Sequence, residues 1–345
     1  MTYPGTAEFG FELVTCRWAE RAWPPDRGST AVPVVARQLG TQQRRWDTIV
    51  VEADPDALDA RAAFGERALD SDLLHVVRNA PAEWAWYRDA LPDPGYPWRY
   101  VRAAVHRADA RGAVETRRDG NRIEIRRVAS YPDWVRRIVA IENKPDLDAS
   151  AARALADQLA HDVATALADE VWVATAATDT TVEPALLADL PVEAGVLVLD
   201  VTDTSEARVA WHPARLDPTS DTSLSAGEKA AKRLEIAERA YGSGWRSYVE
   251  TMRPDCRWFE LRDRAGAFVP WCAAKSHHQT AAECAGSCSE FQPEPPAWRT
   301  RGWPIEGGPG KGIKRLLAAR RRRRRYTDTC NSLAAVRRDG SANRR

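Results

Sequence analysis

Apolar residues near the start of the chain follow first a helical and then a strand periodicity. Between residues 6 and 23 they recur every three to four positions, which predicts a helix. Residues 31–39 and 46–53 are instead rich in valine and other apolar residues, which predicts two strands. The short polar stretch between these runs, residues 40–45, is typical of a hairpin loop, so the two strands should pair side by side.

A second group of apolar segments begins at residue 137. The nearly continuous run at 137–142 is typical of a strand buried on both faces, and residues 149–169 carry an apolar stripe at helical spacing. Further apolar runs at 170–175 and 194–200 predict two more strands. A strand, a helix and a strand at this spacing imply a right-handed crossover, so the sequence predicts an α/β fold with a mixed sheet.

Between these two groups, the chain from about residue 69 to 128 has a different character. Helical pieces are expected at 70–80, 82–91 and 97–112, followed by a hairpin over 113–128 with Asp119-Gly120 as its turn. Three helices and a basic hairpin are the order of a winged helix, and the alternative is a small helical insertion with solvated arginines. The candidate nucleic-acid-binding residues are Arg99, Arg102, Arg117, Arg118 and Arg122.

The remaining chain changes composition twice. A polar linker precedes an amphipathic helix that begins near residue 227, and four of the six cysteines then follow between residues 251 and 310. The predicted domains are residues 1–66 and 131–216 as the two parts of the α/β core, 67–130 as the winged-helix-like insertion, 217–250 as linker and helix, 251–310 as a cysteine-rich metal-binding region, and 311–345 as a basic disordered tail.

Charge is distributed unevenly along the chain. Residues 311–345 hold thirteen of the 50 basic and two of the 49 acidic residues, which leaves a net charge of −10 on residues 1–310. An acidic body with a basic tail is unlike a uniformly basic nucleic-acid coat protein. No run of about eighteen apolar residues predicts a membrane span, and the first residues lack the pattern of a secretory signal. We therefore expect a cytoplasmic protein without a membrane partner.

Polar side chains occupy the end of the apolar run at 137–142. Glu142 and Lys144 would lie on the same face of a strand, where burial is costly unless each charge is paired or binds a metal. A Mg²⁺ ion needs oxygen ligands, often one or two carboxylates, so Glu142 requires a second carboxylate. Asp47 begins the strand at 46–53 and would lie opposite Glu142 in an antiparallel pair, whereas Asp133 lies nine residues before Glu142. Asp47 is favoured because its strand is longer.

These residues resemble a known nuclease superfamily. Pro132-Asp133 and Glu142-Asn143-Lys144 are similar to the motif of the PD-(D/E)xK superfamily, whose restriction endonuclease-like core runs helix, three-strand meander, helix and strand. The resemblance implies Mg²⁺-dependent hydrolysis of DNA phosphodiester bonds, with an Asp and Glu142 binding the metal and Lys144 assisting the attacking water.

The same resemblance implies two supporting residues. Gln158 lies in the helix after the motif, where the superfamily often has a supporting glutamine, and Glu12 matches by position a glutamate of the first helix that sometimes joins the metal shell. An insertion of some eighty residues between Asp47 and Asp133 departs from the pattern. Segments along nearly the whole chain, including RRWDTIVVE and IAERAYGSGW, also resemble an uncharacterised family of haloarchaeal proteins.

Two alternatives to a nuclease stay open at this point. Lys144 could form a salt bridge at the strand end with Asp146 or Asp148. The protein could then be a non-catalytic DNA-binding or scaffold protein that keeps the fold without the chemistry. In either case DNA is the expected partner, and the six consecutive arginines at 320–325 could add sequence-independent affinity for phosphates.

The cysteine-rich region suggests a structural metal. Four thiolates suit a tetrahedral Zn²⁺ ion and also an iron–sulfur cluster, and zinc is favoured. The spacing, with fifteen, eleven and three intervening residues, is not a standard zinc-finger pattern. The alternatives are free thiols or disulfides. The candidate ligands are Cys256, Cys272, Cys284 and Cys288.

Overall fold

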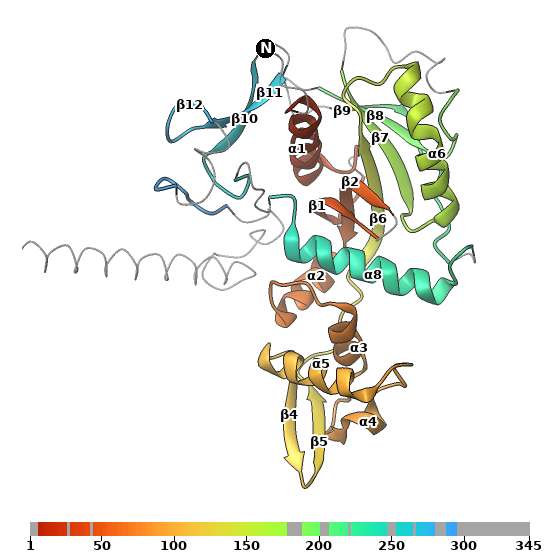
Figure 1. The fold of residues 1–345 in the computed structure, drawn as a ribbon, viewed down its shortest axis with the longest axis vertical. Coiled ribbons are helices and arrows are strands. Elements are labelled where there is room, and N and C mark those ends of the chain that lie inside the picture. The colour runs from red at the N-terminus through yellow and green to blue at the C-terminus, as the bar shows by residue number, and fades with distance from the viewer. Residues whose placement is uncertain are drawn as a thin grey trace, which may run out of the picture. The chain divides into compact units, whose positions relative to one another are not determined.

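A six-stranded mixed sheet forms the centre of the fold (Figure 1). The computed structural model describes residues 6–25, 28–41, 44–177, 188–200, 207–219, 222–246, 253–264, 267–279 and 288–294, which include seven α-helices. The strands, in sheet order, are β1 (Val32–Gly40), β2 (Arg45–Ala53), β6 (Val135–Asn143), β7 (Glu170–Ala176), β8 (Gly195–Leu199) and β9 (Ala207–Trp211). The predicted α/β class with a mixed sheet is therefore confirmed.

The pairing of these strands follows the predicted sequence of elements. β1, β2 and β6 form an antiparallel meander, β6 to β8 run parallel, and β9 closes the sheet in the antiparallel direction. Helix α6 (Ala149–Thr165) makes the crossover from β6 to β7. The sequence does not predict the edge strand β9, because its five residues, ARVAW, are too few to show a clear strand periodicity.

Both faces of the sheet are covered by helices, which explains why its strands are apolar along most of their length. Helices α1 (Thr6–Ala22) and α8 (Ala226–Ser243) pack on one face together with Trp172, whereas α6 packs on the other face together with Val173. Neighbouring residues of β7 thus enter different cores, because strand side chains alternate between faces. In the described part of the chain, no helix is long and apolar enough to cross a membrane.

Helix α6 is four residues shorter than expected. It ends at Thr165, and Ala166 adopts a left-handed conformation with φ of 47°. The predicted end was Asp169, whose backbone N–H instead donates to Ile138 O at 2.7 Å and whose carboxylate accepts from Ile138 N at 2.7 Å. These two hydrogen bonds hold Asp169 beside β6 at the start of β7, so the helix ends before this residue.

The residues between β2 and β6 form a module with its own core. Its elements are α2 (Pro55–Arg61), a 3₁₀ turn (Ala62–Phe64), α3 (Ser71–Asn79), β3 (Ala85–Trp86), α4 (Tyr87–Ala90), α5 (Trp98–Ala110), β4 (Val114–Asp119) and β5 (Arg122–Arg127). The three strands pair in the order β3-β5-β4, and a separate cluster of buried apolar residues runs from Phe64 to Ile125. The helical piece expected at 82–91 is corrected: Ala85 pairs with Ile125 as a strand, and only a short helix follows.

A buried ion pair connects this module to α8. Arg61 and Glu238 are both fully buried and paired, and Glu238 also accepts hydrogen bonds from Tyr131 Oη at 2.7 Å and Leu69 N at 2.8 Å. Such a pair is stable in a dry interior only when the remaining polar atoms are also satisfied. The Arg61 guanidinium meets this condition by donating to the carbonyls of Gly65 and Arg67.

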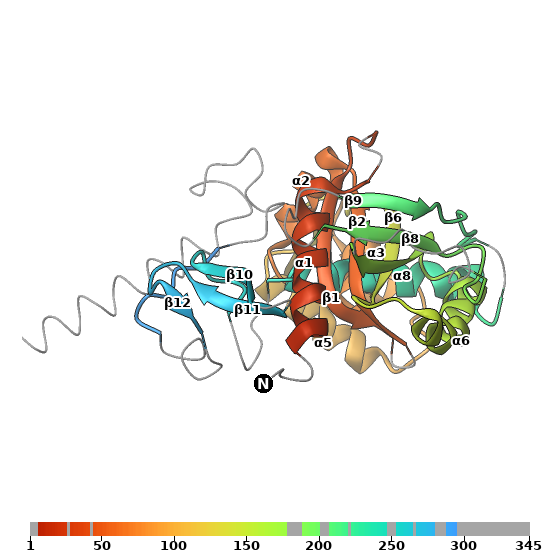
Figure 2. The same ribbon diagram turned by 90° about the horizontal axis from the view of Figure 1, so that it is seen from above.

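The cysteine-rich segment contains a small sheet that was not predicted. β10 (Phe259–Arg264), β11 (Ala267–Cys272) and β12 (His277–His278) pair antiparallel in that order. β11 packs against α1, so this helix lies between the small sheet and the central sheet (Figure 2). Cys284 and the predicted tail at 311–345 lie outside the described residues.

Candidate functional site

Two carboxylates meet at one end of the central sheet. Thr48 of β2 pairs with Ile141 of β6, so Asp47 and Glu142 face each other at the next position of this antiparallel ladder. Glu142 also pairs in register with Val173, which packs under α6, so the side chain of Glu142 lies on the α6 face. Glu142 is buried and Asp47 is half-buried.

Lys144 continues the same ladder. Its backbone N–H donates to Ala174 O at 2.8 Å, which extends the parallel pairing one residue past the end of β6. Because strand side chains alternate, Lys144 lies on the same face as Glu142, and its side chain is half-buried. Two acidic groups and one basic group therefore lie at one end of the sheet.

Arg44 is a member of this cluster that sequence reasoning missed. It lies immediately before β2, and its guanidinium pairs with Glu142 and with Asp162 of α6. The distances to Asp162 are 2.9 Å from Nε to Oδ1 and 2.8 Å from Nη2 to Oδ2. Nothing in the sequence distinguishes Arg44 from Arg45 beside it, whereas Asp162 could have been found as the residue one turn after Gln158.

Glu12 of α1 is joined to the cluster through Gln38. The Gln38 amide donates to Glu12 Oε2 at 2.9 Å and to Asp47 Oδ1 at 3.3 Å. Gln38 has φ of 54°, a left-handed conformation that is uncommon for a residue other than glycine. This conformation lets Gln38 bridge the two carboxylates, while Arg37 pairs with Glu12 at 3.4 Å.

The amide of Asn143 fixes the position of Asp47. The Asn143 backbone N–H donates to Asp47 Oδ2 at 3.0 Å, and its side-chain Nδ2 donates to Thr48 Oγ1 at 3.0 Å. Thr48 in turn contacts Cys16 Sγ of α1 at 3.4 Å. Asp47 therefore has one oxygen held by Asn143 and the other by Gln38.

Electrostatics at this end of the sheet favour a cation. Burial raises the pKa of Glu142 to about 7, with Asp47 and Asp162 adding to the shift and Arg44 opposing it. Burial also raises the pKa of Glu12, although Arg37 and Gln38 act in the opposite direction. Four carboxylates thus share two guanidinium groups and the ammonium group of Lys144, which leaves one negative charge in excess beside the hard oxygen donors.

The structure separates the two candidate aspartates. Asp133 is exposed and precedes the first residue of β6, whereas Glu142 lies near the last, so nine residues of extended chain, about 30 Å, separate them. Asp47 is the aspartate that lies beside Glu142. Gln158 is half-buried on α6, one turn before Asp162, on the side of the helix that carries the Asp162 carboxylate.

The candidate nucleic-acid-binding arginines are all exposed in the inserted module. Arg99 and Arg102 lie on α5, Arg117 and Arg118 on β4, and Arg122 on β5.

Aromatic rings position three of these arginines. The guanidinium carbon of Arg99 lies 4.7 Å from the ring centroid of Tyr100, that of Arg117 lies 4.6 Å from Trp84, and that of Arg122 lies 4.9 Å from Trp86. Arg117 also pairs with Glu124 at 2.6 Å. The module therefore presents guanidinium groups that are partly ordered by stacking.

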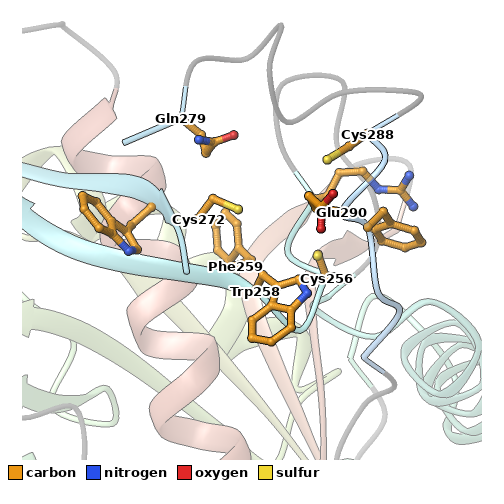
Figure 3. Close-up of a pocket in the computed structure, with 10 residues that line it drawn as sticks. Cys256, Trp258, Phe259, Cys272, Gln279, Cys288 and Glu290 are labelled. Atoms are coloured by element: carbon orange, nitrogen blue, oxygen red, sulfur yellow. The ribbon is translucent and has the colours of Figure 1, made fainter. Parts of the chain in front are cut away.

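Three of the four candidate cysteine ligands line one pocket. Cys256, Cys272 and Cys288 surround it together with Trp258, Phe259 and Glu290, and their sulfur atoms point into the same space (Figure 3). Burial raises the pKa of Cys256, which keeps this thiol protonated in the absence of a cation. Among the described residues, no group of three or more histidine, cysteine or carboxylate side chains is placed to hold a metal ion, and Cys284 is not among them.

Comparison with known proteins identifies a family but no activity. No curated protein and no solved structure matches the chain. The match to a family spans residues 34–293, which include both strands of the carboxylate pair, the inserted module and the cysteine pocket. The expectation of an uncharacterised family is confirmed: the chain belongs to the family of unknown function DUF5787.

Proposed function

We propose that this protein is a metal-dependent nuclease that hydrolyses phosphodiester bonds in DNA. The observation that carries this proposal is the meeting of Asp47 and Glu142 on one face of the sheet, with Lys144 two residues beyond Glu142 on the same face. Two carboxylates and an ammonium group at one strand end are the residue types needed to hold Mg²⁺ and to orient water at a phosphate.

The order of elements supports a restriction endonuclease-like core. Helix α1, the meander β1-β2-β6, helix α6 and the parallel strand β7 follow in the order that the PD-(D/E)xK resemblance implies. The insertion joins Ala53 of β2 to Val135 of β6, which pair with each other. Asp47 lies six residues, about 20 Å of extended chain, from that junction, so the insertion leaves the carboxylate end of the sheet intact.

Each residue at this end has a definable role in the proposed reaction. Asp47 and Glu142 would hold the cation, and Mg²⁺ supplies a Lewis acid for the scissile phosphate when it is bound. Asn143 and Gln38 hold Asp47 in place through the hydrogen bonds described above. Lys144 would orient the attacking water or stabilise the negative charge that develops on the phosphate. Gln158 would support the site from α6.

In this proposal the inserted module binds the DNA. Its order α3, β3, α4, α5, β4 and β5, with β3 paired to β5, corresponds to the helices, strands and wing of a winged helix. We propose that α5 and the hairpin contact the duplex, mainly through phosphates, with the arginines Arg99, Arg102, Arg117, Arg118 and Arg122.

A zinc ion at the cysteine pocket is part of the proposal. Cys256, Cys272 and Cys288 already face one space, and the predicted fourth ligand, Cys284, follows β12 in sequence. Zn²⁺ prefers four thiolates in tetrahedral geometry, and an iron–sulfur cluster is the alternative for the same ligands. The ion would stabilise a segment that has little apolar core of its own.

One observation favours a second function, a DNA-binding or scaffold protein without catalysis. Arg44 already neutralises Glu142 and Asp162, which is what a protein that has lost its metal site would be expected to show. Under the nuclease proposal, Arg44 must release Glu142 when the cation binds. The two functions therefore differ in whether Glu142 is needed for cleavage.

The test is cleavage of plasmid and single-stranded DNA by the full chain with Mg²⁺ or Mn²⁺, against EDTA. Glu142→Gln keeps the shape of the side chain and removes its charge, and DNA binding by the same variant, measured in EDTA, serves as the folding control. We expect metal-dependent cleavage by the wild type and at least a hundredfold loss in the variant, with binding unchanged. A folded wild type that binds DNA and does not cleave it would support the scaffold function.

A further inference from the structure

A polar cavity is lined by residues of α1, of β10 and of the turn after α8. Helix α1 packs there against the small sheet, on the side away from the central sheet (Figure 2). The volume of the cavity is about 130 Å³, several times the space of about 10–15 Å³ that one water molecule requires. Six charged residues line it: Arg17, Arg21, Arg246, Arg257, Glu260 and Glu294. We refer to it below as the arginine cavity.

The two glutamates of the arginine cavity already have partners. Glu294 pairs with Arg246 at 3.0 Å, and Glu260 pairs with Arg262 at 3.0 Å. Arg246 is paired again with Glu20 of α1 at 3.2 Å. Within the described ranges, by contrast, Arg17, Arg21 and Arg257 take part in no ion pair.

Unsatisfied donors border the same space. The Nε atoms of Arg17 and Arg246 are buried and have no hydrogen-bond partner among the described residues. The side chain of Arg246 is only 9 % exposed, so bulk water does not solvate it. An unpaired buried donor lowers the stability of the folded protein, and an acceptor that enters the cavity would remove this cost.

Like charges are also crowded around the cavity. Burial lowers the pKa of Arg17, and the neighbouring guanidinium groups of Arg21 and Arg246 lower it further. Four guanidinium groups against two carboxylates line the cavity, which leaves an excess of two positive charges. A phosphate monoester carries nearly two negative charges at neutral pH and three strong acceptor oxygens, and arginine forks match that geometry.

We propose that the arginine cavity binds a phosphate dianion, carried either by free inorganic phosphate or by the terminal phosphate of a nucleic-acid strand. The phosphate would accept hydrogen bonds from Arg17, Arg21 and Arg257, the arginines without ion pairs. The site is formed by α1, the turn after α8, Arg257 just before β10, β10 itself and Glu294, and it shares no residue with the Asp47–Glu142 pair. Phosphate binding in the arginine cavity therefore does not depend on the proposed nuclease function.

The first experiment is a calorimetric titration of the full chain with inorganic phosphate in EDTA. Arg257→Gln removes an exposed side chain that lines the cavity, and Arg17→Gln removes a half-buried one. Arg136→Gln removes an exposed arginine of β6 outside the cavity and is the matched control. We expect each cavity variant to weaken phosphate binding at least tenfold and the control to change it less than twofold.

The second experiment separates the two sources of phosphate. A short DNA oligonucleotide with a 5′-phosphate is compared with the same oligonucleotide ending in a 5′-hydroxyl, again in EDTA so that cleavage plays no part. A binding advantage for the 5′-phosphate that disappears in Arg257→Gln identifies a strand end as the ligand, and phosphate binding without this advantage identifies free phosphate. The proposal is wrong if the wild type binds neither, or if both cavity variants bind as tightly as the wild type.

Discussion

Asp47 and Glu142 face each other across β2 and β6, although they come from distant parts of the sequence. Their proximity raises the pKa of the more deeply buried Glu142 in addition to the effect of burial itself. Like charges held together in a protein interior are costly unless a cation compensates them. In this structure Arg44 provides that compensation, and the nuclease proposal requires a divalent cation to take its place.

Replacement of Arg44 should make the stability of the protein dependent on metal. Arg44→Gln leaves Glu142 and Asp162 as nearly buried carboxylates without their guanidinium, a change that should cost about 3 kcal/mol of unfolding free energy in EDTA. A cation that binds the native state restores stability, so Mg²⁺ should stabilise the variant more than the wild type. Urea unfolding with and without Mg²⁺ measures both effects, with Arg136→Gln as control. Equal responses to Mg²⁺ in variant and wild type would argue against a cation site here.

The inserted module should lose stability in acid through Asp70. Its carboxylate caps α3 by accepting from Leu73 N at 3.0 Å and pairs with Arg107 at 2.6 Å. Partial burial opposes ionisation, yet these bonds lower the pKa of Asp70 below its ordinary value. The stabilisation is therefore complete above the pKa of the unfolded carboxyl, about 4, and is lost as the pH falls through the lower folded value.

Asp70→Ala should accordingly reduce stability by about 1 kcal/mol at pH 6, the usual cost of losing a helix cap, and by less at pH 3. Urea unfolding at the two pH values measures the difference. Asp89→Ala, an exposed aspartate of the same module, is the control and should have little effect at either pH. An equal loss of unfolding free energy at both pH values would mean that the ionisation of Asp70 contributes nothing to stability.

Purified protein should contain about one zinc ion per chain. Cys256→Ser and Cys272→Ser should each lose it, because both thiols line the cysteine pocket. Cys16→Ser alters a buried cysteine of α1 that contacts Thr48 and should keep the metal. Elemental analysis by mass spectrometry distinguishes zinc from iron. Protein that folds without either element would exclude the predicted metal centre.

Charge removal on the inserted module should reduce the salt dependence of DNA binding. Each phosphate contact contributes a slope of about 0.9 to the fall of log affinity with log salt concentration. A variant with Arg99→Gln, Arg102→Gln and Arg122→Gln should therefore lower that slope by about 2 to 3. Fluorescence anisotropy with a labelled duplex in EDTA over a series of KCl concentrations measures it. An unchanged slope would place the DNA contacts elsewhere, and Arg136→Gln is again the matched control.

Much of the central sheet could be predicted because its strands are buried on both faces. Continuous apolar runs such as the one ending at Ile141 leave few alternatives, and the hairpin loop after Gly40 sets the pairing of β1 with β2. Once β2 and β6 are taken as antiparallel neighbours, the position of Asp47 opposite Glu142 follows from strand geometry alone. Asp133 lies nine residues before Glu142 along the same extended segment, so its carboxylate cannot lie beside that of Glu142.

Other parts of the site could not be predicted, because they depend on tertiary contacts without a local signature. Arg44 reaches Glu142 and Asp162 from a loop, and Gln38 bridges two carboxylates only because its backbone is left-handed. The strand Ala85–Trp86 is too short to have a periodicity, and its pairing with β5 decides its conformation. In the small sheet, β10 is rich in charged residues, β11 contains a proline and β12 has only two residues, so none of these strands is evident in the sequence.

A comparison of Asp47 with Asp133 tests the proposed metal site. Two properties are measured in parallel for the wild type, Asp47→Asn and Asp133→Asn. Electron paramagnetic resonance monitors Mn²⁺ binding, and a separate assay measures DNA cleavage. We predict that Asp47→Asn weakens Mn²⁺ binding at least tenfold and abolishes cleavage. Asp133→Asn changes an exposed residue at the other end of β6 and should leave both unchanged. Equal Mn²⁺ binding by the wild type and Asp47→Asn would contradict the assignment of a metal site to Asp47 and Glu142.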